Sequence, residues 1–401
     1  MPRVERVGAR KGGRFVVRAA RIVRQAGLLG ASFLARAARW LDSADPGAHG
    51  RIKGLRLVTS YGIAAMLGTM SDITRGLQSH ASLATLAGGF ALWACVSEVR
   101  GTRTESSRDL AILSAAAGIG AAGFAILAPL LARLGQHGTE LALISGAFCV
   151  GWLRRYGPTG TGIGSQIFIG QLLAYGAGLT PADLPEIVSA SGIAAAAAVT
   201  QRVLSGPAER PPPQIALPVQ RPGAMRPEIA MGVQSALGAL LIVLLNFAFG
   251  LLESAWAVTA STYVIAASAT STRGRVIRRI LGTAAGVPLG LAFLPLVAPA
   301  PLLAWTAAAI AMVIYAMALP KRYDIACGAY AFTLIVTLAA TGEQSVSLLG
   351  ARAWETVLGG LIGFIMASVV FPLRGDGSLA SDQMGARDAS SLPDVSAPPE
   401  R

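Results

Sequence analysis

Two ionisable residues within an apolar stretch are the strongest candidates for chemistry. Arg352 and Glu355 lie three residues apart in the apolar run 347–371, so a helix would present them on one face. A charge inside a lipid-spanning segment is costly and tends to mark an ion or substrate pathway. Because a guanidinium binds a carboxylate through a planar two-point contact, Arg352 is suited to orient a carboxylate, with Glu355 competing for it or carrying a proton. The alternative is an internal Arg–Glu ion pair that fixes helix packing.

Three acidic or aromatic positions extend this set. Trp256 follows Glu253 at the start of an apolar run, and its indole ring offers a surface for another ring. Glu253 is alternatively a solvated turn residue. Asp324, directly after Lys321 and Arg322, is either a gating or proton-accepting group or one partner of an interfacial salt bridge.

Several polar residues inside apolar runs complete the candidates. His80 opens the run 81–97 and is alternatively a plain interfacial residue, and Thr283 is the last candidate for contact with a substrate. Neutral hydrogen bonds, to a substrate or between helices, are available from Gln166, Gln171 and Asn246.

The composition points to a helical membrane protein. Of 401 residues, 53% are hydrophobic and only 14% charged, against about 25% charged in soluble domains. This excludes a disordered chain, a disulfide scaffold and a coiled coil. Twelve apolar runs lack strict alternation, so we expect an all-α polytopic protein of about twelve transmembrane helices. The runs are 55–70, 81–97, 110–131, 139–153, 161–179, 184–204, 228–250, 254–272, 276–296, 301–319, 323–341 and 347–371.

Reactive side chains show no metal or hydrolytic pattern. Cys95, Cys149 and Cys327 lie far apart without CxxC spacing, so they are interpreted as packing residues, and the three histidines do not pair at metal spacing. No Ser/His/Asp set and no Walker motif is present. We therefore expect neither an enzyme nor a metal or other cofactor.

The distribution of basic residues predicts the topology. With the N-terminus inside, the inner loops hold fifteen Lys/Arg and the outer loops two, Arg75 and Arg133, which places both termini in the cytoplasm. The net charge of +13 therefore reflects loops facing anionic lipid, and no nucleic-acid partner is expected because no basic patch alternates with aromatic residues.

The chain is expected to have five parts. Residues 1–54 are a basic cytoplasmic segment in which 14–41 form an amphipathic helix on the membrane or, alternatively, a partly disordered tail. Two six-helix transmembrane units, 55–204 and 228–373, flank a proline-rich cytoplasmic linker, 205–227. Residues 374–401 are expected to be a disordered cytoplasmic tail.

The two units resemble each other. Three pairs of segments correspond in order: 80–101 with 253–274, 114–118 with 282–286, and 154–156 with 321–323. Six helices per unit is an even number, so both units enter the membrane from the same side. A parallel repeat about an axis along the membrane normal is predicted, with a pathway between the units.

Small residues four apart predict close helix contacts. Gly282, Gly286 and Gly290 form one such series and Gly359 and Gly363 another. The spacing favours close packing of helices. An interface that slides during transport is the alternative.

The second unit resembles a known family. Its motifs are Glu253-Ser-Ala-Trp256, Arg279-Ile-Leu-Gly-Thr283 and Arg352-Ala-Trp-Glu355-Thr-Val-Leu-Gly. They resemble the FUSC family, the fusaric acid resistance and aromatic acid exporter proteins of bacterial inner membranes, and are distantly similar to plant aluminium-activated malate transporters. The first unit has Pro185 and Val188 where the repeat would place Arg352 and Glu355, so one functional site per chain is expected, in the second unit.

The resemblance implies export of hydrophobic or aromatic organic acids from a bacterium across its inner (plasma) membrane, driven by protons. It also implies a periplasmic adaptor and an outer-membrane channel as partners. The other expected partners are the lipid bilayer, the organic anion and further copies of this chain in a homo-oligomer. In this interpretation Arg352 orients the carboxylate, Trp256 accepts the ring, and Glu355 or Asp324 exchanges protons. The alternatives are a passive organic-anion channel and a non-transport envelope or assembly subunit.

Overall fold

The computed structural model describes residue 43 and residues 45–75, 82–99, 102–205, 226–319, 321–342 and 345–373. The chain divides into two compact units, Met1–His49 and Gly50–Arg401. The short helix η1 (Pro46–Ala48) lies in the first unit, and the long helices belong to the second. The expected amphipathic helix at 14–41, most of the linker and the C-terminal tail lie outside the described residues, as does His80.

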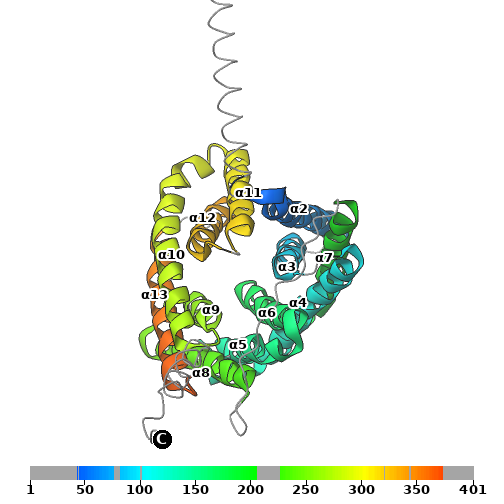
Figure 1. Cartoon of the computed structure of the whole chain (residues 1–401). Helices are drawn as coiled ribbons and strands as arrows, with labels where there is room; N and C mark the ends of the chain where they lie inside the picture. Colours follow the sequence, from blue (N-terminus) through cyan, green and yellow to red (C-terminus); the bar gives the residue numbers. More distant parts are fainter. Residues whose placement is uncertain are drawn as a thin grey trace, which may run out of the picture. The chain divides into compact units, whose positions relative to one another are not determined.

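Every regular element in the described residues is helical, which confirms the all-α class (Figure 1). The first six α-helices are α2 (His49–Arg75), α3 (Leu83–Ser97), α4 (Arg103–Leu131), α5 (Ala142–Trp152), α6 (Gly157–Gly176) and α7 (Leu184–Leu204). The next six are α8 (Pro227–Phe249), α9 (Ser254–Val264), α10 (Ala269–Val297), α11 (Pro301–Ala318), α12 (Tyr323–Ala340) and α13 (Val346–Val369). Short 3-10 helices η2 to η5 join some of them: η2 (Ala132–Leu134), η3 (Gly138–Leu141), η4 (Leu153–Tyr156) and η5 (Pro181–Asp183).

Among the described residues, seven helices are long and apolar enough to cross a membrane: α4, α7, α8, α10, α11, α12 and α13. By contrast, α5 and α9 have 11 residues each, about half the length that spans the hydrocarbon of a bilayer. The chain is therefore a multi-pass helical membrane protein that contains both long and short helices.

One predicted helix is wrong. The apolar run 254–272 was expected to be continuous, but α9 ends at Val264 and α10 begins at Ala269. Side chains satisfy the interrupted backbone: the Ser268 hydroxyl accepts a hydrogen bond from the N–H of Ser271, and the N–H of Ala266 donates to Thr272 Oγ1 at 3.0 Å. Serine and threonine compete with the helical backbone in this way, which hydropathy alone does not detect.

Several corresponding pairs of helices pack together in both sets of six helices. In the first set α4 packs against α6 and α7, α3 against α7, and α5 against α6; in the second set the corresponding pairs are α10 with α12 and α13, α9 with α13, and α11 with α12. The sets meet where α5 packs against α8, and again where Leu57 of α2 and Met312 of α11 lie in one buried cluster (Figure 1).

The even-numbered helices all begin at one end of this unit, here called the basic end. At this end Lys53 of α2 contacts Glu98, which precedes α4, and Arg154, which precedes α6, contacts Met231 of α8. At the far end Glu140, which precedes α5, contacts Asn246 of α8. The far end is called the opposite end. It holds Glu253 and the first turns of α13.

The predicted small-residue series lie at close helix contacts. A Cβ atom at Gly286 would overlap the carbonyl oxygen of Gly328, so α10 and α12 approach with backbone against backbone. A Cβ at Gly359 would likewise overlap the carbonyl oxygen of Ala257, which fixes α13 against α9. A Cβ at Gly282 or Gly363 would also meet a backbone carbonyl oxygen, whereas one at Gly290 would meet the side chain of Ile335.

Candidate functional site

Arg352 lies against an aromatic ring and a carboxylate at the opposite end. Its guanidinium carbon is 4.6 Å from the centre of the Trp256 ring, and Nη2 is 3.7 Å from the carboxylate of Glu253. The side chain of Arg352 is 9% exposed, whereas that of Glu253 is 22% exposed. The start of α9 provides Glu253 and Trp256, and the second turn of α13 provides the arginine.

Glu355 plays a different part from the one that its spacing suggests. It is fully buried, and its Oε1 accepts a hydrogen bond of 2.9 Å from the backbone N–H of Glu253. A carboxylate at this place is favourable because the first N–H groups of a helix lack partners inside the helix. The other oxygen, Oε2, is buried without a hydrogen-bond partner. The ion pair of Arg352 is thus with Glu253, and Glu355 holds the N-terminus of α9.

Aromatic rings from both sets of helices continue from Trp256. Tyr330 of α12 lies 6.3 Å from Trp256 and 5.3 Å from Trp93 of α3, measured between ring centres. Tyr315 of α11 lies 6.0 Å from Tyr330 and 6.4 Å from Trp93. All four rings are half-buried, so they leave apolar surface beside the guanidinium. Arg352, Glu253 and these four rings are called the Arg352 cluster.

This combination suits a ligand with a ring and a carboxylate. The guanidinium supplies a directional contact for an anion, and aromatic faces and edges favour stacked or edge-on rings by about 0.5–1.5 kcal/mol per pair. The carboxylate of Glu253 occupies the place that a substrate carboxylate would take.

Asp324 and Thr283 do not join the Arg352 cluster. Asp324 forms an ion pair with Arg322, with Nη2 at 2.8 Å from Oδ2, at the exposed start of α12. Its carboxylate hydrogen bond raises the pKa of the Arg322 guanidinium above its ordinary value. Thr283 is buried on α10 beside Gly282.

The neutral polar candidates bond between helices. Gln166 of α6 donates to the carbonyl of Trp93 at 2.7 Å, and Gln171 donates to Ser145 of α5 at 2.9 Å. Asn246 donates to the buried carboxylate of Glu140 at 2.8 Å, across the two sets of helices.

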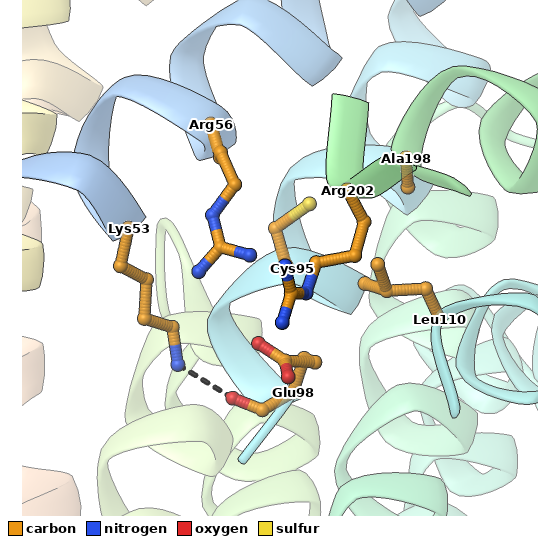
Figure 2. Close-up of a pocket in the computed structure, with 7 residues that line it drawn as sticks. All are labelled: Lys53, Arg56, Cys95, Glu98, Leu110, Ala198 and Arg202. Atoms are coloured by element: carbon orange, nitrogen blue, oxygen red, sulfur yellow. Dashed lines mark hydrogen bonds between the residues drawn. The ribbon is translucent and has the colours of Figure 1, made fainter. Parts of the chain in front are cut away.

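A second polar cluster lies at the basic end, in a pocket that Figure 2 shows. Lys53 Nζ donates to the carbonyl oxygen of Glu98 at 2.6 Å, at the C-terminus of α3. The Glu98 carboxylate accepts from Ser106 at 2.6 Å, and the fully buried Arg202 donates to the same hydroxyl at 2.8 Å. These bonds fasten α2, α3, α4 and α7 to one another.

Three members of the Arg352 cluster were not among the sequence candidates: Trp93, Tyr315 and Tyr330. Each lies in an ordinary apolar run, where an aromatic residue carries no distinguishing signal. One clue was present for Trp93, which lies in segment 80–101, the predicted repeat counterpart of the segment that contains Trp256.

The comparisons with known proteins support the predicted resemblance. The family model described as fusaric acid resistance protein-like matches residues 239–366, from α8 to α13. The match covers Glu253, Trp256, Arg352 and Glu355, and it confirms the resemblance of this part of the chain to that family. No curated protein and no solved structure matches the sequence.

Proposed function

From the family match to the second half, we propose that this multi-pass membrane protein exports hydrophobic or aromatic organic acids. The chemistry of the Arg352 cluster supports this substrate class. The carboxylate of the substrate displaces Glu253 from Arg352, and its ring lies along Trp256 and Tyr330.

The single observation that carries the proposal is the position of Arg352 between the face of Trp256 and the carboxylate of Glu253. A buried guanidinium needs an anionic partner. Because Glu253 is the more exposed of the two, it can turn towards water while a substrate carboxylate replaces it. The exchange keeps the charge of Arg352 compensated throughout.

We propose further that the two sets of helices are repeats, with the pathway between them. Helices α4 and α10 are both 29 residues long, and several corresponding pairs of helices pack together in both sets. The contact of α5 with α8 has its counterpart in the contact of α11 with α2. Under a parallel repeat, all twelve helices form the membrane domain, bounded by 55–204 and 228–373, and the short helices cross only part of it.

The orientation follows from the charge of the two ends. Arginines and lysines concentrate at the basic end, and the positive-inside rule assigns such an end to the cytoplasm. The protein would then lie in the inner membrane of a bacterium, with both termini in the cytoplasm. The Arg352 cluster then lies nearer the periplasmic face. Export would continue through a periplasmic adaptor and an outer-membrane channel.

Coupling to the proton gradient is assigned to Glu355 rather than to Asp324. Glu355 is buried next to Glu253, and one of its oxygens has no hydrogen-bond partner. Asp324 is paired with an exposed arginine away from the cluster. A proton taken up by Glu355 would reduce the negative charge beside Arg352 at the moment when the substrate leaves.

The test replaces Arg352 by glutamine and by lysine in a bacterial strain sensitised to aromatic acids. Arg352→Gln should abolish resistance at equal protein abundance, and Arg352→Lys should retain little, because an ammonium lacks the planar fork. Arg273→Gln, at an exposed arginine of α10, is the matched control and should retain resistance. Full resistance with Arg352→Gln would contradict the proposal.

Flux measurements separate the proposed transporter from the alternatives. In liposomes, export driven by a pH gradient supports the transporter. Flux that follows voltage and needs no protons would instead assign a passive organic-anion channel. Absence of any flux would favour a non-transport assembly subunit.

A further inference from the structure

Three arginines at the basic end have no carboxylate partner. Arg154 of η4 donates to the thioether sulfur of Met231 at 3.4 Å, Arg275 to the carbonyl of Ile265 at 3.5 Å, and Arg279 to the hydroxyl of Tyr323 at 3.3 Å. The two bonds to oxygen are long, and a thioether is a weak acceptor. Within the described part of the chain, no ion pair involves any of the three.

Two of these guanidinium groups also carry unsatisfied buried donors. The Nε atoms of Arg154 and Arg279 are buried and have no hydrogen-bond partner. An unpaired buried charge is among the most costly features that a protein can contain. Arg154 and Arg279 each leave one such donor unsatisfied at the basic end.

Two of the three arginines lie near the phenol of Tyr263, and the third, Arg275, lies near Arg154. Arg154 interacts electrostatically with Arg275 and with Tyr263, and Tyr263 interacts with Arg279. The hydroxyl of Tyr263 is 2.8 Å from Ser165 Oγ of α6, a contact between the two sets of helices. Like charges near one another are unfavourable, so an anion placed here would offset a repulsion that the protein itself leaves uncompensated.

Other arginines in the described chain are compensated differently. Arg322 pairs with Asp324, Arg352 pairs with Glu253, and Arg155 lies over the rings of Trp152 and Tyr156. Within the described residues, Arg154, Arg275 and Arg279 have neither an ion pair nor a ring contact of this kind.

This group lies on the route to the Arg352 cluster. Helices α10 and α13 run antiparallel, with Val276 next to Gly360 and Val287 in one cluster with Leu349. In this antiparallel packing Arg352 lies beside position 284 of α10. Arg279 comes five residues before that position, which is ~8 Å along the helix at 1.5 Å per residue. Side chains tilt towards the N-terminus of the helix that carries them. Arg279 therefore points to the basic end, where α10 begins, and Arg352 points to the opposite end, where α13 begins.

Tyr330 connects the two groups. Its phenol interacts electrostatically with both Arg279 and Arg352. The same ring contacts Trp93 and Trp256. An anion that left one arginine would therefore meet an aromatic side chain before the other arginine.

We propose that Arg154, Arg275 and Arg279, with the hydroxyls of Tyr263 and Tyr323, form a second binding site for the carboxylate of the transported aromatic acid. This site receives the anion at the basic end and passes it to Arg352. The guanidinium groups bind the carboxylate, and the ring packs beside Tyr263 and Phe168, whose rings already lie 5.9 Å apart. This inference rests on the proposed function.

The first test measures flux of benzoate in proteoliposomes of the full chain, with benzoate supplied from either side. The double variant Arg154→Gln/Arg279→Gln should raise the benzoate concentration for half-maximal flux at least tenfold when benzoate enters from the basic end. The effect from the opposite end should be smaller. Arg273→Gln, on the same helix as Arg279 but exposed and outside the group, should match the unmodified protein.

The second test measures thermal stability, because a purely structural role predicts the opposite sign. Without an anion, Arg154→Gln should unfold at the same or a higher temperature than the unmodified protein, since it removes a charge that repels Arg275. Benzoate should raise the unfolding temperature of the unmodified protein and have a smaller effect on the double variant. A lower unfolding temperature of Arg154→Gln without benzoate would assign the arginines to folding and overturn the inference.

The two proposals fail in different ways. If Arg352→Gln stops flux while the double variant retains normal flux from both sides, the second site is wrong and the proposed function stands. If the unmodified protein moves no benzoate and gains no thermal stability from it, the substrate class itself is wrong, and the second site is wrong with it.

Discussion

The carboxylate of Glu355 on α13 accepts a hydrogen bond of 2.9 Å from the backbone N–H of Glu253, at the N-terminus of α9. A side chain from a distant helix thereby caps the helix that presents Trp256 to Arg352. The geometry of the Arg352 cluster consequently depends on a residue that does not itself contact the guanidinium through an ion pair.

Replacing Glu355 separates this capping role from proton transfer. Gln keeps an acceptor oxygen, so Glu355→Gln should unfold close to the unmodified temperature, whereas Glu355→Leu should lose about 1 kcal/mol of stability, as a lost helix cap does. Thermal unfolding in detergent measures both. Glu355→Gln should also lose the dependence of export on a pH gradient; export that still follows the gradient would remove Glu355 from proton coupling.

Trp256 is expected to affect affinity rather than folding. Cation–π contacts contribute about 0.5–2 kcal/mol, so Trp256→Ala should weaken binding of aromatic acids by about two- to thirtyfold. Trp256→Phe should bind aromatic acids more weakly than the unmodified protein and more tightly than Trp256→Ala, because the phenylalanine ring attracts a cation less strongly than an indole does. Titration calorimetry with the purified protein is the measurement, and Trp354→Ala, at an exposed tryptophan of α13, is the control. Equal losses from both substitutions would argue against a specific role for Trp256.

A pair of glycines on α13 tests the close contact with α9. A Cβ at Gly359 would overlap the carbonyl oxygen of Ala257, so Gly359→Ala should lower stability by about 1–3 kcal/mol. A Cβ atom at Gly350 would instead have open space around it. Gly350→Ala should therefore leave stability unchanged or raise it by up to about 1 kcal/mol. Thermal unfolding of the two variants side by side would reveal whether backbone contact, and not helix propensity, requires Gly359.

Arg202 should matter for stability at the basic end. Because it is buried and donates to Ser106, Arg202→Met should cost about 1.5–3 kcal/mol, the range for hydrogen bonds of charged groups. Arg103→Gln, exposed at the start of α4, is the comparison and should change stability by less than about 0.5 kcal/mol. An equal effect of both substitutions would mean that net charge, and not the buried contact, stabilises this end.

Local rules were sufficient to find Arg352, Glu355, Glu253 and Trp256. A charge in an apolar run is costly wherever the run lies, so its position can be inferred without knowing its neighbours. The partner of Arg352 could not be inferred in the same way. Glu355 shares a helix face with it, but the loop before α9 brings Glu253 closer, and this depends on the packing of α9 against α13.

The residues that could not be predicted from the sequence are those whose role depends on packing between the two sets of helices. Tyr330 becomes informative only when α3, α9 and α11 bring three other rings to it. The apolar run 276–296 places Arg279 in the first turn of the predicted helix; the helix begins at Ala269, which places Arg279 ten residues inside it. The hydroxyl of Ser268 that caps α10 was the available local signal.

The position of Tyr330 between Trp93 and Trp256 has an optical consequence. The two indoles come from different sets of helices and touch the same phenol, so their separation changes whenever one set rotates against the other. In a chain with six tryptophans, the emission of Trp93 and Trp256 should respond to such a rotation, which would give the protein an intrinsic optical reporter of motion between the two sets.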